Sequence, residues 1–373
     1  MGADGTATMA GATAGDGATG LPARRWRRLW EAMDRQGVAA LGGYGRGSLG
    51  SYGPLHFLTG CFAPPKGGFG LIETGRAPVL VAGSEIEAGL LEAGARAAGV
   101  EVRRGPHPSA AASTGALLAA AAGDGAVGLA SPAGGVPAGE LALLRGAAEG
   151  TEVRDLSAAF EEVRTDLDPE DVRLLEAAAA GAEAALERFA AGFAVGISER
   201  EAAAEIDAEL SRRGALTRIV FVAGGSFRGR PPSERPLRPG EPITVLVEQA
   251  APSGHWVEIG VIAAAGGLDA EAQRVADACV AALRAGATGL RPGAPCGQVA
   301  AAMEGALRER GGRPISNLGH GTGVDEAPPP IAAHSTAPVR AATAFALHTS
   351  FAALSGADEP TATVANTFVV AGD

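Results

Sequence analysis

Apolar residues recur along the first half of the chain with two different periods, which predict helices and strands in turn. A helix is expected from Pro22 onward, because apolar residues there are spaced three or four positions apart. This stripe consists of Trp26, Leu29, Trp30 and Met33. Short apolar runs predict strands at 38–41, 55–58, 69–72, 78–81, 125–129 and 151–153, with helices at 85–98 and 138–147. Strands alternating with helices are typical of an α/β domain with a partly parallel sheet.

A second periodic region begins after a junction at residues 164–169. Asp168 is a good helix N-cap and Pro169 suits the first helical position, so a long helix is expected to start there. Another helix should begin at Ser198, because Glu201 stands at capping-box spacing. The later expected elements are a strand at 218–222, a hairpin at 243–262, helices at 269–285 and 299–310, and strands at 344–349 and 361–369. Two helix pairs, each followed by paired strands, predict an internally duplicated α+β domain.

The length of the chain predicts two domains, because 373 residues exceed the size at which a single core usually stops growing. We expect an N-terminal α/β domain at 22–164 and a C-terminal domain at 165–373, which makes the protein α+β overall. Residues 1–21 are rich in glycine, alanine, threonine and aspartate, and this composition predicts a disordered tail.

Charge and cysteine content narrow the classes of partner. The formal net charge of −11 argues against nucleic acid, which is bound by clustered lysine and arginine. No apolar run reaches the roughly 20 residues needed to cross a bilayer, so no membrane partner is expected. Three scattered cysteines fit neither a disulfide framework nor a zinc site. We therefore expect a cytoplasmic protein that acts on a small-molecule substrate.

A histidine set among glycines is the most distinctive chemical motif. It reads Leu318-Gly319-His320-Gly321-Thr322-Gly323 and follows an expected helix. Glycine lets the backbone approach closely and adopt positive φ, so this run can aim His320 into a crowded site. The same run could serve only as a tight loop between two elements.

Five short motifs occur in a fixed order along residues 24–373. They are His56-Phe57-Leu58-Thr59-Gly60, the junction Val163-Arg164 with the helix start after it, Ile197-Ser198-Glu199, Leu237-Arg238-Pro239-Gly240-Glu241, and the glycine-histidine run. In this order they resemble the pita-bread family, which includes creatinase, prolidase, aminopeptidase P and methionine aminopeptidase. The resemblance implies a creatinase-like two-domain fold and, as in many family members, a homodimer.

The resemblance also implies a metal site on the expected hairpin. The family's peptidases hold two divalent metals with two hairpin aspartates, one histidine and two glutamates, a set of hard ligands suited to hydrolysis. Glu258 stands at the second hairpin carboxylate. The first falls on Val247, or on Glu248 if the turn is one residue shorter.

The other ligand positions depart further from the family's pattern. His320 is retained, but His348 and Ala365 stand where the family has its two glutamates. Too little negative charge is left to hold two cations close together. We therefore expect the two-metal site to be lost and no metal cofactor to be bound.

Glu258, His320 and His348 would still converge if the fold holds. As a metal-free acid–base cluster they resemble the creatinase branch, and groups of this kind can have their pKa values separated for proton transfer. This leads to our main hypothesis, a metal-independent hydrolase or lyase acting on a small amide or amidine in a specialised biosynthetic pathway. Creatine itself is not expected as the substrate, because the stretch 229–233 lacks the histidine that creatinase uses.

Two alternatives stay open for the same three residues. Two histidines and one glutamate are a legitimate ligand set for a single zinc or iron ion. Alternatively, catalysis is lost and the pocket binds a peptide or a protein, as in family members that serve as interaction modules.

Four further residues are candidates for substrate binding. Trp256 shares a strand face with Glu258 by two-residue alternation. Glu248, if it faces inward, must be paired or protonated. Arg228 or Arg230 could meet a substrate carboxylate in a bidentate pair.

Overall fold

The computed structural model describes residues 21–64, 66–130, 135–227, 229–355 and 361–372. The tail expected at 1–21 lies outside these residues, apart from Leu21. The chain forms two compact units, of which the first comprises residues up to Gly47 and Pro54–Val163. The second comprises Ser48–Gly53 and Arg164–Asp373. Within the described ranges, no helix has both the length and the apolar character needed to cross a bilayer.

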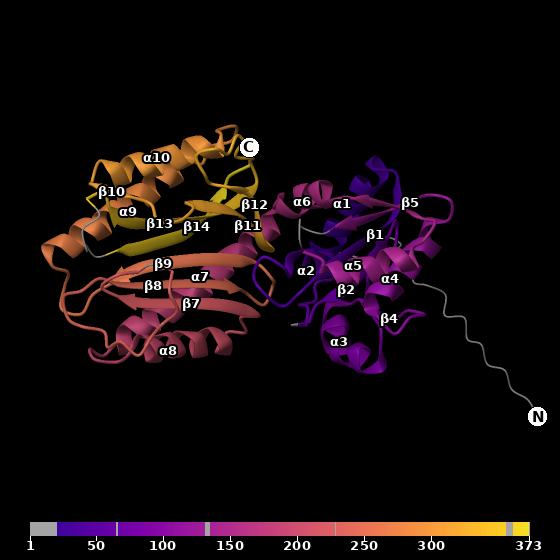
Figure 1. Ribbon diagram of the computed structural model, residues 1–373, viewed down its shortest axis with the longest axis horizontal. Helices are drawn as coiled ribbons and strands as arrows, with labels where there is room; N and C mark the ends of the chain where they lie inside the picture. Colours follow the sequence, from indigo (N-terminus) through magenta and orange to yellow (C-terminus); the bar gives the residue numbers. More distant parts are fainter. Residues whose placement is uncertain (1–20, 65, 131–134, 228, 356–360, 373) are drawn as a thin grey trace, which may run out of the picture. The chain divides into compact units, whose positions relative to one another are not determined.

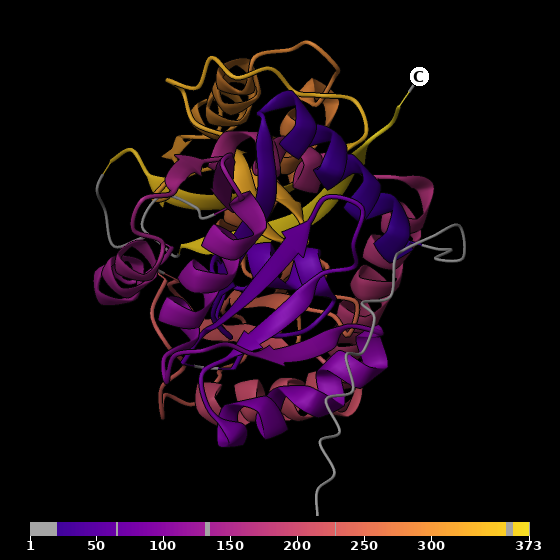
Figure 2. The same ribbon diagram turned by 90° about the vertical axis from the view of Figure 1, so that its right-hand side faces the viewer.

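The first unit is built on a six-stranded mixed sheet in the order β4-β3-β2-β1-β5-β6. Its strands are β1 (Val38–Gly45), β2 (Gly68–Glu73), β3 (Val79–Ala82), β4 (Glu101–Arg104), β5 (Ala126–Ala130) and β6 (Glu152–Asp155). Its helices are α1 (Leu21–Arg35), α2 (Gly53–Thr59), α3 (Glu85–Ala98), α4 (Ala110–Ala122), α5 (Ala138–Ala147) and α6 (Ser157–Thr165). Figure 2 shows these strands, in indigo to magenta, with helices packed around them.

Helices α2 and α4 cover opposite faces of this sheet. Neighbouring strand residues point to opposite faces, and a Cβ on Gly42 would touch Leu118 of α4, whereas one on Gly43 would touch Leu58 of α2. The strand expected at 55–58 is therefore wrong, because this segment is part of α2. A run of four residues that includes three apolar ones fits a short strand or a buried helix equally well, and only packing decides between them.

The second unit contains an eight-stranded antiparallel sheet in the order β12-β11-β13-β14-β9-β8-β7, with β10 paired to β13. Its strands are β7 (Thr217–Gly224), β8 (Ile243–Ala250), β9 (Trp256–Ala263), β10 (Gly312–Arg313), β11 (Gly319–Gly323), β12 (Asp325–Pro330), β13 (Thr343–Ala353) and β14 (Ala362–Val370). Its helices are α7 (Pro169–Gly192), α8 (Glu199–Arg212), α9 (Ala270–Gly289) and α10 (Cys296–Arg308).

The two helix pairs of this unit pack on successive halves of the sheet (Figure 1). Helices α7 and α8 bury their apolar faces against β7, β8 and β9, and α9 and α10 bury theirs against β13 and β14. Both expected capping boxes are present, at Asp168 with Asp171 and at Ser198 with Glu201. The arrangement of helix pair and strands occurs twice, as the sequence predicts.

The glycine-histidine run is a strand and not the loop that the sequence suggests. It forms β11, which pairs with β12 on one side and β13 on the other. A Cβ on Gly321 would overlap the carbonyl oxygen of Pro328, and Gly319 has a φ of 142°, which residues with a side chain rarely adopt. The glycines therefore let two neighbouring strands close around the backbone on either side of His320.

This packing makes a prediction for two matched glycine substitutions. Gly321→Ala should destabilise the second unit by about 1–3 kcal/mol, because the new methyl group overlaps the β12 backbone. Gly323→Ala should change stability by less than about 1 kcal/mol, since its Cβ would lie 3.6 Å from the nearest atom, in Leu167. Urea unfolding of both variants measures the difference. Equal stability of the two would show that β12 does not hold β11 this tightly.

Candidate active site

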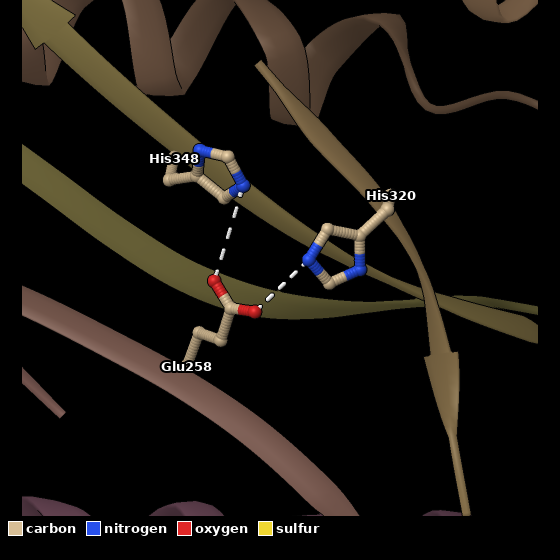
Figure 3. Close-up of side chains that lie close together, drawn as sticks. All are labelled: Glu258, His320 and His348. Carbon is tan, nitrogen blue, oxygen red and sulfur yellow. Dashed lines mark ion pairs between the residues drawn. The ribbon is translucent and has the colours of Figure 1, made fainter. Parts of the chain in front are cut away.

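Glu258, His320 and His348 converge on one point of the second unit. The Nε2 atom of His320 lies 3.0 Å from Oε1 of Glu258, and Nε2 of His348 lies 4.0 Å from Oε2. Figure 3 shows both rings turned toward the two oxygens of the same carboxylate. The three residues that the sequence singles out as a cluster are therefore close neighbours.

Three strands of the sheet carry these side chains. Glu258 lies on β9, His320 on β11 and His348 on β13. His320 pairs with Ala346, two positions before His348, so both imidazoles project from the same face. The hydroxyl of Thr322 donates to the carbonyl of Trp256, 3.0 Å away, and fixes β11 against the start of β9.

The register of the hairpin decides which residue faces Glu258. Glu248 on β8 pairs directly with Glu258, whereas Val247 pairs with Ile259 and is fully buried. The turn is thus short enough for Glu248, and not Val247, to face Glu258. The two glutamates are close cross-strand neighbours.

Both ring nitrogens of His320 face hydrogen-bond acceptors. Nδ1 lies 2.9 Å from the carbonyl oxygen of Gly321, and Nε2 faces the carboxylate of Glu258. Burial alone would lower the pKa of His320, but the hydrogen bond and the charge of Glu258 raise it to about 9. His320 is therefore an imidazolium at neutral pH.

Glu258 is held as a carboxylate by its partners. Burial raises its pKa, yet the hydrogen bond and positive charge of His320 outweigh burial and bring the pKa below its ordinary value. The indole Nε1 of Trp256 also donates to Oε1, at 3.2 Å. On the main chain, the N–H of Glu258 donates to the hydroxyl of Thr367 over 3.0 Å.

The other two ionisable groups are neutral at pH 7. Burial, followed by the nearby charge of Glu258, raises the pKa of Glu248 to about 8. Burial lowers the pKa of His348, although Glu258 and a hydrogen bond to the backbone of Asn317 act in the opposite direction. With Glu248 included, the site therefore contains an imidazolium (His320), a carboxylate (Glu258), a neutral imidazole (His348) and a carboxylic acid (Glu248).

A cavity of about 310 Å³ opens beside the cluster. This volume is at the small end of the range for small-molecule sites. The residues that line it are Leu49, Phe221, Phe227, Gly229, Leu246, Glu248, Glu258, Ile315, Ser316, Asn317, His320, Glu326, His348, Ser350 and Thr363.

Leu49 reaches this cavity because Asp325 anchors its segment. The carboxylate of Asp325 accepts the backbone N–H groups of Gly50 and Gly53, each at 2.8 Å. Asp325 is buried at the tight turn between β11 and β12, where its φ is 75°. Burial raises its pKa to about 6.

The structure places Trp256 and Arg230, two of the expected substrate contacts, outside the lining of the cavity. Trp256 is fully buried and contributes to holding Glu258 rather than to lining the cavity. Arg230 forms a bidentate ion pair with the fully buried carboxylate of Glu199, with both N–O distances 2.5 Å. Burial opposes ionisation of Glu199, but Arg230 and Ser233 lower its pKa to about 2. Arg228 lies outside the described residues.

Three of the lining residues that were not singled out from the sequence bring a charge or an aromatic ring to the cavity. Glu326 brings a carboxylate to the cavity from β12, while Phe221 and Phe227 bring aromatic rings. Glu326 follows the glycine-histidine strand closely, and its position near His320 could have been a signal. Phe227 precedes a stretch without regular structure, so no periodicity marks its position.

The ligand atoms of Glu258, His320 and His348 lie within 4.8 Å of one another, a spacing that could hold one metal ion. Ala365 offers no ligand atom. It pairs with His348 and packs with Ala223, Phe227 and Leu246 in an apolar cluster. The residues present therefore fit one cation and do not fit the two-metal set that the family resemblance implies.

The second unit matches the sequence model of metallopeptidase family M24 over residues 173–371, which is more than half of the chain. A search of curated proteins found no significant match.

Solved structures of similar fold cover nearly the whole chain. The prolidase from Pyrococcus horikoshii is 16% identical, covering 93% of this chain and 95% of its own, with a TM-score of 0.75. Dipeptidase PepE from Mycobacterium ulcerans is 23% identical, with coverages of 94% and 93% and a TM-score of 0.74. The N-terminal domain of FACT complex subunit SPT16 from Cicer arietinum is 17% identical, with coverages of 94% and 95% and a TM-score of 0.64.

These likenesses confirm the two-domain fold that the motifs predict, with an N-terminal domain followed by a pita-bread domain. Since the family model spans both halves of the sheet that carries the cluster, the chain belongs to metallopeptidase family M24.

Proposed function

We propose that the protein is a metal-independent enzyme that cleaves a C–N bond in a small amide or amidine by acid–base chemistry. One observation carries the proposal: both ring nitrogens of His320 face acceptors, while His348 lies 4.0 Å from Glu258, beyond hydrogen-bonding range. Two imidazoles beside one carboxylate thus hold different numbers of protons. Groups whose pKa values are separated in this way suit the roles of acid and base.

Each group then has a defined role in hydrolysis. Neutral His348 takes a proton from the water that attacks the substrate carbon, and cationic His320 gives its Nε2 proton to the leaving nitrogen as the C–N bond breaks. The proton gained by His348 passes back to His320 by way of Glu258 or solvent, which restores the starting state. The protonated carboxyl of Glu248 can donate a hydrogen bond to the oxygen on which negative charge develops.

The proton distribution can be measured without a substrate. In NMR titrations of ring nitrogens, His320 should stay an imidazolium up to a pH of about 9, and His348 should stay neutral to below 6.5. In Glu258→Gln the pKa of His320 should fall, because the hydrogen bond and the charge of Glu258 no longer offset the effect of burial. An unchanged titration in this variant would contradict the assignment of the ion pair.

The same shift has a consequence for stability. The folded chain raises the pKa of His320 from 6.5 to about 9, so the stabilisation by the ion pair is complete below pH 6.5 and is lost as the pH rises through 9.

Substitution of either imidazole tests the catalytic roles. His320→Asn and His348→Asn should each lower turnover of a C–N-bonded substrate about 100-fold or more, the usual contribution of a positioned acid or base. His334→Asn, in an exposed turn, is the matched control and should leave turnover unchanged. Circular dichroism melting of all three variants separates loss of chemistry from loss of folding. Full activity in His320→Asn would exclude His320 as the acid.

A single bound metal ion is the second candidate, and the anchoring of the two rings favours it. His320 forms a hydrogen bond with the carbonyl oxygen of Gly321, and His348 forms one with the backbone of Asn317. Both rings direct Nε2 at Glu258. Metal-binding histidines are commonly oriented by such bonds. A divalent cation held by Glu258, His320 and His348 would supply Lewis acidity toward a substrate carbonyl.

Metal content distinguishes the two candidates. Protein purified without chelators should contain far less than one equivalent of zinc, iron or manganese by elemental analysis. Its melting temperature should not change on adding EDTA, because no bound ion would be removed. One tightly bound ion per chain, together with a lower melting temperature in EDTA, would overturn the metal-independent proposal.

A further inference from the structure

Two exposed apolar side chains are neighbours on α3 of the first unit. Ile86 is 80% exposed and Leu90 is 72% exposed, the highest values among the large apolar residues that the structure describes. They are four positions apart on one helix, so they lie on the same face, about one turn from each other. Isolated exposed apolar residues are common on protein surfaces, whereas neighbouring ones form a patch that marks a contact surface.

The same face of α3 continues with small residues. Ala93 and Ala97 follow Leu90 at successive helical spacings, and both are exposed. The face is therefore large in its N-terminal half and small in its C-terminal half. When two copies of α3 pack antiparallel with Ile86 opposite Ala97, Leu90 falls opposite Ala93. Each large side chain then meets a small one, so the face is complementary to itself.

The charges of α3 favour the same antiparallel arrangement. Glu85 and Glu87 lie in its first turn, and Arg96 lies in its last turn. An antiparallel pair places the acidic turn of each helix beside the basic turn of the other. The ion pairs that these residues form within the chain, Glu85 with Arg104 at 3.0 Å and Arg96 with Glu92 at 3.1 Å, are exposed. Surface pairs of this kind contribute little, so both side chains can exchange partners.

A groove of about 560 Å³ lies beside this face, between α3 and β4 (Figure 1). Alanine, glycine and valine residues form its apolar part, and its charged residues are Glu85, Glu92, Arg96 and Arg104. The formal charges of these two glutamates and two arginines cancel. The chain as a whole has a net charge of −11, which makes two copies repel each other. A face whose charges cancel therefore suits contact between them.

Gly89 stands inside α3 on the side of this groove. A Cβ at this position would meet no described atom within 4 Å, so the packing of the first unit does not require glycine. Glycine weakens the middle of a helix relative to other residues. It also lets another backbone approach closely, which a second helix on this face would use.

We propose that α3 is the interface of a homodimer in which two copies pack their α3 helices antiparallel about a twofold axis. Ile86 and Leu90 of each copy lie against the partner's Ala97 and Ala93. A pair of short helices buries less surface than a standard stable complex, so we expect a reversible dimer with a micromolar dissociation constant. The proposal concerns the first unit and does not depend on the chemistry of the second.

Sedimentation equilibrium of the full chain, from about 1 to 200 µM, measures this association. Leu90→Glu should weaken the dimer about tenfold or more, because it places a charge against an apolar surface of the partner. Leu143→Glu is the matched control, since Leu143 is also 49% exposed but lies on α5, outside the patch. A monomer at every concentration, or a dimer that Leu90→Glu does not weaken, would overturn the proposal.

A second variant separates the interface from folding. Gly89→Gln should raise the melting temperature of the monomer by about 2 °C or more, because glutamine is the better helix former. The same change should weaken the dimer about tenfold or more, since the new side chain obstructs close approach. A purely structural role of Gly89 would leave association unchanged, and that result would contradict the close packing of the two helices.

Disulfide cross-linking tests the antiparallel register. When Leu90→Cys and Ala93→Cys proteins are mixed and oxidised, disulfides between the two variants should exceed those within either one. The native cysteines are buried and do not compete. Preferential linkage of Leu90→Cys chains to each other would indicate a parallel pair and contradict the proposed register.

Discussion

The ion pair between Glu258 and His320 is the interaction on which the site depends. A carboxylate that is only 3% exposed has to be paired, because an isolated buried charge costs several kcal/mol. The surrounding structure stabilises this pair from both sides. The indole of Trp256 donates to Oε1 of Glu258, and the carbonyl of Gly321 accepts from Nδ1 of His320. Close strand packing around β11 brings Nε2 of His320 to 3.0 Å from Oε1 of Glu258. Loss of Glu258 would lower the pKa of His320, and loss of His320 would leave Glu258 buried without its charge partner, so the two residues depend on each other in folding as well as in chemistry.

The pair also explains why the rest of the cluster is neutral. The imidazolium of His320 balances the carboxylate of Glu258. A second ionised carboxyl beside Glu258 would be opposed by burial and by repulsion from Glu258. Glu248 accordingly retains its proton to about pH 8. A glutamate at position 365 would add a further negative charge that only additional cations could balance. With alanine at 365 and histidine at 348, neither position adds negative charge, so the proton on His320 is enough to neutralise Glu258.

The sequence predicted those features that depend on local spacing or on family motifs. The caps at Asp168 and Ser198, the hairpin and the convergence of Glu258, His320 and His348 all follow from residues close together or from a known order of motifs. The sequence did not predict the features that depend on packing between distant segments. The register that puts Glu248 opposite Glu258 depends on the length of one turn, and the ion pair that removes Arg230 from the cavity joins residues 31 positions apart. The glycine run is a strand because two neighbouring strands approach it, which no local pattern reveals.

The two candidate chemistries differ in which cation neutralises Glu258. In one it is the proton on Nε2 of His320, and in the other a metal ion bound at the same atom. Nε2 cannot carry both, so a metal ion must displace that proton, and metal affinity must fall as the pH drops below about 9. The carbonyl of Gly321 keeps Nδ1 protonated in either state, so the exchange is confined to a single atom. The raised pKa that keeps His320 protonated therefore also opposes metal binding. An apolar wall at Ala365, which cannot contribute a ligand, shifts that competition further toward the proton.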